Sequence, residues 1–236
     1  MRIAGRIVAE VLLVLKNSIQ PGMKTRELDV IAERELKKLG AKSSFKGYYG
    51  YPASICVSIN EEIVHGIPGD KMIKSGDIVS MDVGSIYEGY QGDSALTVGV
   101  GEISPKAKEL MKVTEGALAA GISSARSGAR LGDIGAAIQE YAEIRGFSVV
   151  REYTGHGIGR QMHEDPLIPN FGTRGHGIEL KKGMTLAIEP MLNIGDWHTK
   201  PGKDGWVVYT ADGSLSAHFE HTIAVTDGEP EMLTVL

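Results

Sequence analysis

A chain of 236 residues with 42% hydrophobic and 23% charged residues has the composition of a folded globular protein that can bury a core without disulfides. The formal net charge of −5 argues against a general nucleic-acid-binding protein, which would usually carry a basic surface. Cys56 is the single cysteine, so no intrachain disulfide can form.

The first apolar stretch, residues 3–15, is interrupted by Arg6 and Glu10, and its longest clean run is Val11 to Leu15. That run is too short for a signal sequence or a membrane span. We therefore expect this stretch to form a helix of a cytoplasmic protein that has no membrane attachment.

A helix bracketed by glycines is predicted twice in the chain: residues 25–39 lie between Gly22 and Gly40, and residues 133–145 lie between Gly128 and Gly146. In both copies the two glycines are 18 residues apart, and the copies are offset by 106 residues. Glycine is typical of the position after a helix, where the backbone needs a positive φ. Ser104 followed by Pro105 has the pattern of a helix start and opens the second copy.

The strands that follow are duplicated too. Residues 76–82 align with residues 183–189, and each run is a glycine turn that leads into a β-rich segment ending in a carboxylate. Residues 93–98 likewise resemble residues 220–225, a carboxylate followed by a strand. We predict an α+β fold with pseudo-two-fold symmetry, in which helices pack on one face of a curved, mostly antiparallel sheet. The halves, about 1–102 and 103–236, would form a single domain.

Four carboxylates recur at the duplicated positions. Asp82 lies in an apolar strand, where a buried carboxylate is costly unless it is paired or coordinated, although a surface-facing Asp82 stays open. Asp93 could equally be a turn residue. Glu189 and Glu220 adjoin further apolar strands. Four solvated acids would not explain this recurrence, and no lysine or arginine is close in sequence, so a pair of divalent metal ions is the better partner.

Histidines complete the candidate site. His156 lies between Gly155 and Gly157, which we expect to let the backbone approach a ligand closely. His163 and His65 are further candidates. An oxygen-rich set with one imidazole suits Mn²⁺, Fe²⁺, Co²⁺ or Zn²⁺. The remaining histidines are of less interest: His176 and His198 are expected to be ordinary loop residues, while His218 and His221 flank Glu220 and could support the ligands or simply face the sheet.

These residues resemble a known family in four stretches: residues 60–68, 76–82, 153–159 and 216–222. Their order and context are similar to type I methionine aminopeptidases, metallopeptidases of the pita-bread fold, and the resemblance covers essentially the whole chain. It implies that one catalytic domain removes the initiator methionine from nascent proteins when the second residue is small, through a metal-activated water.

The resemblance also implies residue roles. Five residues would bind two metal ions (Fe²⁺, Mn²⁺, Co²⁺ or Zn²⁺): Asp82, Asp93, His156, Glu189 and Glu220. Asp93 and Glu220 would bridge both ions, and Glu189 would also move a proton. His65 and His163 would contact the scissile peptide. The methionine pocket would contain Phe45, Tyr48, Tyr51, Cys56, His65, Met162, His163 and Trp206, a soft lining suited to a thioether. A structural Na⁺ or K⁺ would bind near Asn60, Glu62 and Ser216.

The resemblance implies that the partners are nascent polypeptide N-termini and, transiently, the ribosome. It also implies that the protein is a monomer without nucleic-acid specificity. The segment 196–211, which corresponds to a lysine-rich hairpin in some relatives, keeps Lys200 and Lys203 but is weakly basic. Two alternatives stay open: an Xaa-Pro aminopeptidase or prolidase, and a non-catalytic peptide-binding protein of the same fold.

Overall fold

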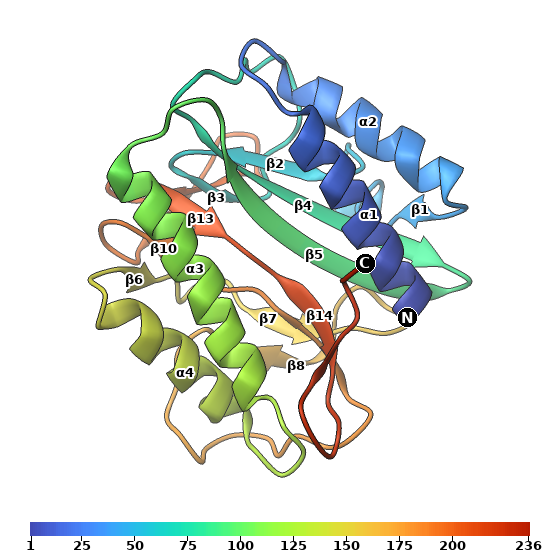
Figure 1. Ribbon diagram of the computed structural model, residues 1–236, viewed down its shortest axis with the longest axis vertical. Helices are drawn as coiled ribbons and strands as arrows, with labels where there is room; N and C mark the ends of the chain where they lie inside the picture. The colour runs from blue at the N-terminus through green and yellow to red at the C-terminus, as the bar shows by residue number, and fades with distance from the viewer.

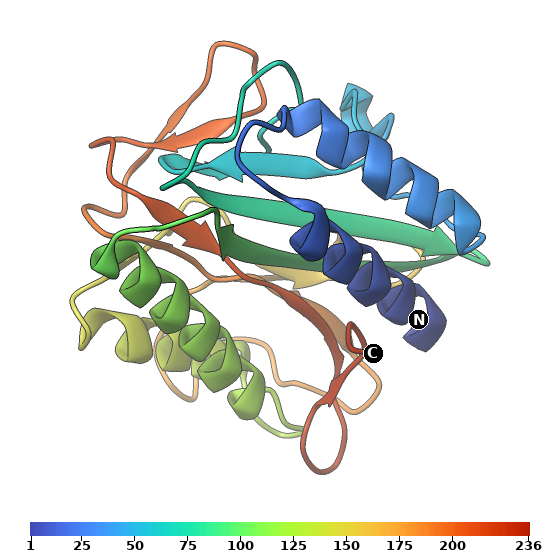
Figure 2. The ribbon, with the colours of Figure 1, turned by 45° about the horizontal axis from the view of Figure 1, so that its top comes forward.

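The computed structural model describes residues 1–236 and places four helices on one side of curved antiparallel sheets (Figure 1, Figure 2). The helices are α1 (Arg2–Ser18), α2 (Thr25–Lys38), α3 (Pro105–Ser124) and α4 (Leu131–Glu143). In Figure 1, α1 and α2 cover the first half of the molecule and α3 and α4 cover the second half, on the same face. No helix has both the length and the apolar composition needed to cross a bilayer.

The first half contributes a sheet in which β4 (Ile78–Tyr87) pairs along one edge with β5 (Tyr90–Gly99) and along the other with β1 (Lys42–Ser43) and β2 (Cys56–Ile59). The second half contributes a five-stranded sheet with the order β15-β14-β9-β7-β8. Its strands are β7 (Gly155–Gly157), β8 (Glu164–Ile168), β9 (Thr185–Ile188), β14 (His221–Ala224) and β15 (Glu231–Met232).

Two small sheets complete the fold. One has the order β13-β10-β6, with β6 (Ser148–Val149), β10 (Met191–Asn193) and β13 (Ser216–His218). The other has the order β11-β12-β3, with β3 (Glu62–Val64), β11 (Thr199–Pro201) and β12 (Val208–Thr210), so the segment 196–211 is a hairpin. A short 3-10 turn, η1, spans Tyr48–Gly50. Every strand pairing is antiparallel, which confirms the predicted fold class.

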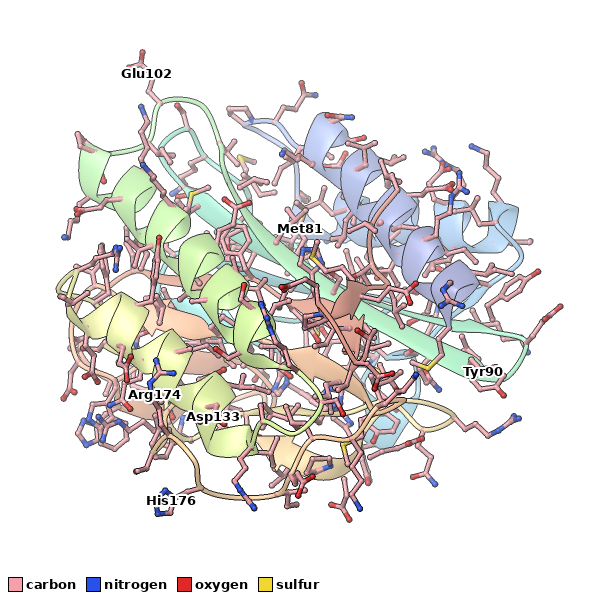
Figure 3. The ribbon with its side chains drawn as sticks, turned by 60° about the horizontal axis from the view of Figure 1, so that its bottom comes forward. Met81, Tyr90, Glu102, Asp133, Arg174 and His176 are labelled. Carbon is pink, nitrogen blue, oxygen red and sulfur yellow. The ribbon has the colours of Figure 1, made fainter.

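The glycines at the helix ends have the backbone that the repeat predicts, since Gly22, Gly40, Gly128 and Gly146 all have φ between 75° and 91°. The second repeated helix, α4, begins at Leu131 rather than at Asp133. The reason is a cap: the Asp133 carboxylate accepts a hydrogen bond of 2.7 Å from the backbone N–H of Arg130, so Asp133 lies inside the first turn (Figure 3).

Each half has its own hydrophobic core. Helix α1 buries Val8, Val11 and Leu15 at helical spacing, and these side chains join Met81 of β4 in one cluster. Under α3 and α4 a second cluster gathers residues such as Leu110 and Leu186. Each fully buried aliphatic side chain contributes about 1.5–3 kcal/mol, so both cores hold their sheets without help from the site between them.

Candidate metal centre

The two acids of the first half lie on neighbouring strands. Asp82 is on β4 and Asp93 is on β5, and the strand register pairs Asp82 with Ala95 and Asp93 with Gly84. The two carboxylates are therefore diagonal neighbours on one face of the sheet. Asp93 is 3% exposed, so it is a buried strand residue and not a turn residue.

The acids of the second half lie at strand ends. Glu189 directly follows β9, and Glu220 directly precedes β14. These strands pair His221 with Ile188, so extending the register by one residue places Glu220 opposite Glu189. These are the places that the duplicated pattern predicts, at the end of one β-rich run and just before another strand. The strand β9 ends at Ile188, shortly before Pro190, which has no N–H to donate to a ladder.

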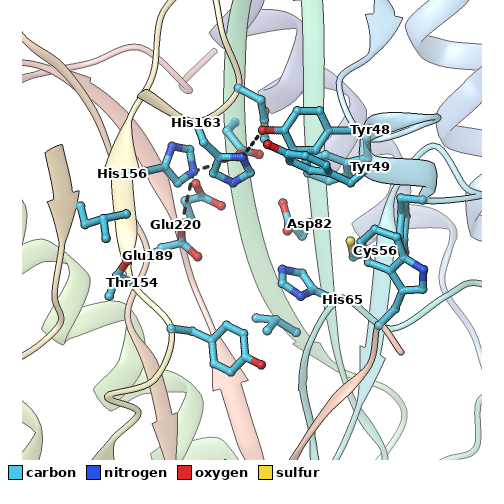
Figure 4. Close-up of a pocket in the computed structure, with 18 of the residues that line it drawn as sticks. Tyr48, Tyr49, Cys56, His65, Asp82, Thr154, His156, His163, Glu189 and Glu220 are labelled. Atoms are coloured by element: carbon cyan, nitrogen blue, oxygen red, sulfur yellow. Dashed lines mark hydrogen bonds and ion pairs between the residues drawn. The ribbon is translucent and has the colours of Figure 1, made fainter. Parts of the chain in front are cut away.

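The two halves bring these residues together. Ligand atoms of Asp93, His156 and Glu220 lie within 4.8 Å of one another. The Nε2 atom of His156 is 3.5 Å from Oε1 of Glu189 and 3.8 Å from Oδ2 of Asp93. Figure 4 shows Glu189, Glu220 and Asp82 around one opening beside His156.

The carboxylates of the cluster have too few protein partners. Oδ1 of Asp82, Oδ1 of Asp93 and Oε1 of Glu220 are buried and form no hydrogen bond. Burial raises the pKa of Asp82 to about 7. Burial, together with the neighbouring acids, raises the pKa values of Asp93, Glu189 and Glu220 well above their usual range.

The only ion-pair contacts of the cluster are with His156 and His218, and no lysine or arginine approaches it. Bound cations would supply the missing charge and the missing partners, since divalent metal ions accept oxygen donors of this kind. The residues therefore fit a metal centre.

His156 is held in the form that binds metal ions. Its Nδ1 lies 2.8 Å from the carbonyl oxygen of Gly157, so Nδ1 carries the proton and donates it, and the lone pair of Nε2 faces the acids. Burial lowers the pKa of His156 to about 4, which keeps the ring neutral.

The glycines beside His156 let neighbouring strands pack closely on β7. A Cβ at Gly155 would lie 2.3 Å from the carbonyl oxygen of Ala187, and a Cβ at Gly157 would lie 2.2 Å from that of Asp165. The glycines therefore make room for the backbone on both sides of β7, a requirement that the sequence does not show. Close approach of the backbone to a ligand stays a prediction.

A cavity of about 370 Å³ adjoins the acids and is lined by all thirteen side chains proposed as ligands, pocket residues or catalytic groups: Phe45, Tyr48, Tyr51, Cys56, His65, Asp82, Asp93, His156, Met162, His163, Glu189, Trp206 and Glu220. Its inner end is soft and aromatic. The rings of Tyr51 and Trp206 meet edge to face with centroids 5.0 Å apart, and Cys56 lies opposite Asp82 in the register of β2 and β4.

His65 and His163 line the same cavity from opposite halves. His65 has a left-handed backbone, with φ at 61°, which is uncommon for a residue with a side chain and is often found at functional sites. Burial lowers the pKa of His65 to about 4 and also lowers that of His163. Both rings are thus neutral groups that can donate or accept a hydrogen bond.

The other histidines are also placed. Nε2 of His218 is buried and lies 3.6 Å from Oε2 of Glu189, so this ring faces a candidate ligand. His221 instead contacts the hydroxyl of Thr234 at 2.8 Å. His176 and His198 are exposed loop residues, as predicted (Figure 3 shows His176).

Six lining residues were not predicted: Tyr49, Val64, Glu152, Tyr153, Thr154 and Leu167. Tyr153 and Thr154 directly precede Gly155, so their position beside the His156 motif could have indicated that they line the cavity. Glu152 accepts a hydrogen bond of 2.9 Å from the backbone N–H of Thr199 and thereby ties the hairpin to the cavity wall. No local pattern indicates that contact.

The residues expected near a monovalent cation are neighbours. The backbone N–H of Ser216 donates to the carbonyl oxygen of Asn60 at 2.9 Å. The Glu62 carboxylate is already engaged by the N–H of Ile59 and the ammonium group of Lys71. Any cation at this place would be held by backbone carbonyl groups, and its presence stays a prediction.

Comparison with known proteins places this geometry among metallopeptidases. Residues 1–227 match the model of metallopeptidase family M24. The chain is 55% identical over 234 residues to methionine aminopeptidase 1 of Bacillus subtilis, covering 99% of this chain and 94% of that protein. It is 52% identical over 236 residues to the methionine aminopeptidase of Clostridium perfringens, covering 100% and 95%.

Solved structures agree with this result. A methionine aminopeptidase from Thermotoga maritima superposes with a TM-score of 0.99 at 49% identity, covering 100% of this chain and 95% of that one. A prolidase from Pyrococcus furiosus shares the fold with a TM-score of 0.79 at 23% identity, and the match spans 62% of its length.

Proposed function

This chain belongs to metallopeptidase family M24, and from that premise we propose that it removes the N-terminal initiator methionine from nascent proteins whose second residue is small. Relatives that are methionine aminopeptidases align along the full chain at 52–55% identity. One observation in this molecule supports the proposal most strongly. A single cavity is lined both by buried carboxylates that lack hydrogen-bond partners and by aromatic and sulfur-containing side chains.

We propose that Asp82, Asp93, His156, Glu189 and Glu220 would hold two divalent ions, Fe²⁺, Mn²⁺, Co²⁺ or Zn²⁺. When bound, the ions supply Lewis acidity, which lowers the pKa of a water molecule and polarises the scissile carbonyl. Support comes from the convergence of these side chains and from their oxygen-rich donor set.

The protein's own groups divide the remaining work. The Glu189 carboxylate accepts the proton of the attacking water and can pass it to the leaving amine. His65 and His163, both neutral, donate hydrogen bonds to the peptide as charge develops on its carbonyl oxygen. The side chain of the departing methionine packs among Phe45, Tyr51, Cys56, Met162 and Trp206, whose sulfur and ring atoms suit a thioether.

Further proposals concern the setting of the reaction. Residues 1–236 would act as a single catalytic domain in a cytoplasmic monomer, since nascent chains are made in the cytoplasm. Lys200 on β11 and Lys203 in the turn that follows are exposed and offer a modest contact to the ribosome. A Na⁺ or K⁺ beside Asn60 and Ser216 would stabilise the loops behind the site.

An Xaa-Pro peptidase is the second candidate, because prolidases share the fold. The two activities are separated by a peptide panel in which the first and second residues vary: Met-Ala-Ser, Met-Leu-Ser, Leu-Ala-Ser and Ala-Pro-Ser, each with the metal-loaded protein. We expect release of methionine from Met-Ala-Ser alone.

N-acetylated Met-Ala-Ser serves as the control and should resist cleavage, because a free amine is required at the metal centre. Equal rates on Met-Ala-Ser and Met-Leu-Ser, or faster cleavage of Ala-Pro-Ser, would contradict the proposed specificity.

A further inference from the structure

The aromatic side chain of Tyr48 has a contact that its place in a hydrophobic pocket does not require. Its hydroxyl oxygen lies 2.8 Å from Nδ1 of His163, a residue 115 positions further along the chain. The two rings are tilted by 33° with centroids 5.3 Å apart (Figure 4). For the His163 side chain this is the only hydrogen bond with the protein, whereas the Tyr48 ring also meets the ring of Tyr49 edge to face, with centroids 4.6 Å apart.

On its other side, the His163 ring packs against His156, with centroids 4.2 Å apart. His163 therefore lies between a candidate ligand and Tyr48, as Figure 4 shows. The backbone before it is a loop, since β7 ends at Gly157 and β8 begins at Glu164. A ring at the end of a loop needs a side-chain contact to keep one orientation, and the Tyr48 hydroxyl is the polar group that provides it.

A neutral imidazole has one N–H and one lone pair, so a bond at Nδ1 decides what Nε2 can do. If the Tyr48 hydroxyl donates to Nδ1, the ring proton is on Nε2, and that N–H is free of protein partners in the cavity. If Nδ1–H donated to Tyr48 instead, Nε2 would carry a lone pair and could not stabilise a developing oxyanion.

We propose that Tyr48 is a positioning residue, whose hydroxyl donates to Nδ1 of His163 and so holds the ring with its Nε2–H directed to the peptide carbonyl. This inference rests on the proposed peptidase function. A residue that only lined the pocket would affect substrate binding, whereas Tyr48 in this role affects turnover, and only by orienting His163.

The test is a double-mutant cycle with Tyr48→Phe, which keeps the ring and removes only the hydroxyl. Loss of one hydrogen bond to a neutral group predicts a fall in kcat of about 3- to 10-fold for Met-Ala-Ser, with KM nearly unchanged. In a His163→Ala background, Tyr48→Phe should cause no further loss. Tyr90→Phe is the matched control, because Tyr90 bonds to Arg160 through its hydroxyl outside the cavity.

A spectroscopic measurement separates this inference from the proposed function. In the protein loaded with diamagnetic Zn²⁺, nitrogen NMR of His163 should show a proton on Nε2 and a lone pair on Nδ1, and Tyr48→Phe should shift the Nδ1 resonance. A His163 protonated at Nδ1, a Tyr48→Phe effect confined to KM, or equal losses with and without His163 would overturn the inference. An inactive wild-type protein with the expected nitrogen pattern would instead refute the peptidase function.

Discussion

The hydroxyl of Thr222 forms two hydrogen bonds with the backbone of Asp93, which lies in the other half of the molecule. It accepts a hydrogen bond of 3.0 Å from the Asp93 N–H and donates one of 2.7 Å to the Asp93 carbonyl oxygen. A second contact runs between the same two segments: the Glu220 N–H donates to the carbonyl oxygen of Ala95 at 2.9 Å. Asp93 and Glu220 are thus each held in place by a residue that lies two positions from the other acid.

Thr222→Val should destabilise the protein, because the substitution keeps the shape of the side chain and leaves a buried N–H and a buried carbonyl group unpaired. Each unpaired group costs about 1–3 kcal/mol. Urea unfolding of the metal-free protein measures the loss, and Thr222→Ser, which keeps the hydroxyl, should retain most of the stability. A Thr222→Val protein as stable as wild type would show that the contact contributes nothing.

Asp82→Asn should have opposite effects on fold and site. The folded-state pKa of Asp82 is about 7 against an ordinary 3.8, so the folded protein binds this proton more tightly than the unfolded chain does. The ionised carboxylate therefore lowers the free energy of unfolding increasingly as the pH rises through this interval.

In metal-free protein, the stability gained from Asp82→Asn should be larger at about pH 8 than at about pH 5. Urea titrations at both values, with metal content measured in parallel, test this expectation. With metal present the same variant should bind metal more weakly, because a neutral amide replaces an anionic donor. A gain in stability that did not depend on pH would mean that burial does not raise the pKa of Asp82.

The two histidines of the segment 156–163 should respond differently to alanine. His156→Ala removes a proposed ligand, so metal content and activity should fall together, and excess metal should restore part of the activity. His163→Ala should keep the metal and lower kcat by about 10²–10³-fold, as loss of an oxyanion donor does. Elemental analysis beside steady-state kinetics decides between them, and an emptied site in His163→Ala would reverse the assignment.

Asp204 should affect methionine binding, although it does not line the cavity, because it fixes the position of Trp206. Its Oδ1 accepts hydrogen bonds from the N–H groups of Trp206 at 2.9 Å and Val207 at 3.0 Å, which fixes the turn that brings Trp206 to Tyr51. Asp204→Ala should raise KM for Met-Ala-Ser by about 3- to 10-fold and leave kcat nearly unchanged. Asp204→Asn keeps the acceptor and should behave as wild type. A fall in kcat alone would contradict a pocket role.

Sequence predicted the architecture well because its repeats are local signals. A glycine after a helix and a carboxylate inside an apolar run, such as Asp82, can be recognised within ten residues. The same reasoning left Asp93 open between turn and strand, since Gly92 beside it suits either. In the structure Gly92 is needed because a Cβ there would lie 2.7 Å from the backbone of Ala4 in α1.

Contacts between distant segments could not be predicted in this way. The bonds from Thr222 to Asp93 and from Tyr48 to His163 join positions more than 100 residues apart, and nothing in either local sequence specifies the partner. The exposed Tyr49, with a left-handed φ of 47°, was missed for a related reason: its conformation depends on the turn η1 and not on its own side chain.

The approximate two-fold relation makes the candidate site similar to a subunit interface. Asp82 and Asp93 come from one half, Glu189 and Glu220 come from the other, and the hydrogen bonds that join Thr222 to Asp93 and Glu220 to Ala95 cross between them. This is the arrangement that two identical half-length chains would form across the dyad of a homodimer. Because both halves belong to one chain, each half can carry its own side chains, and His156 comes from the second half alone.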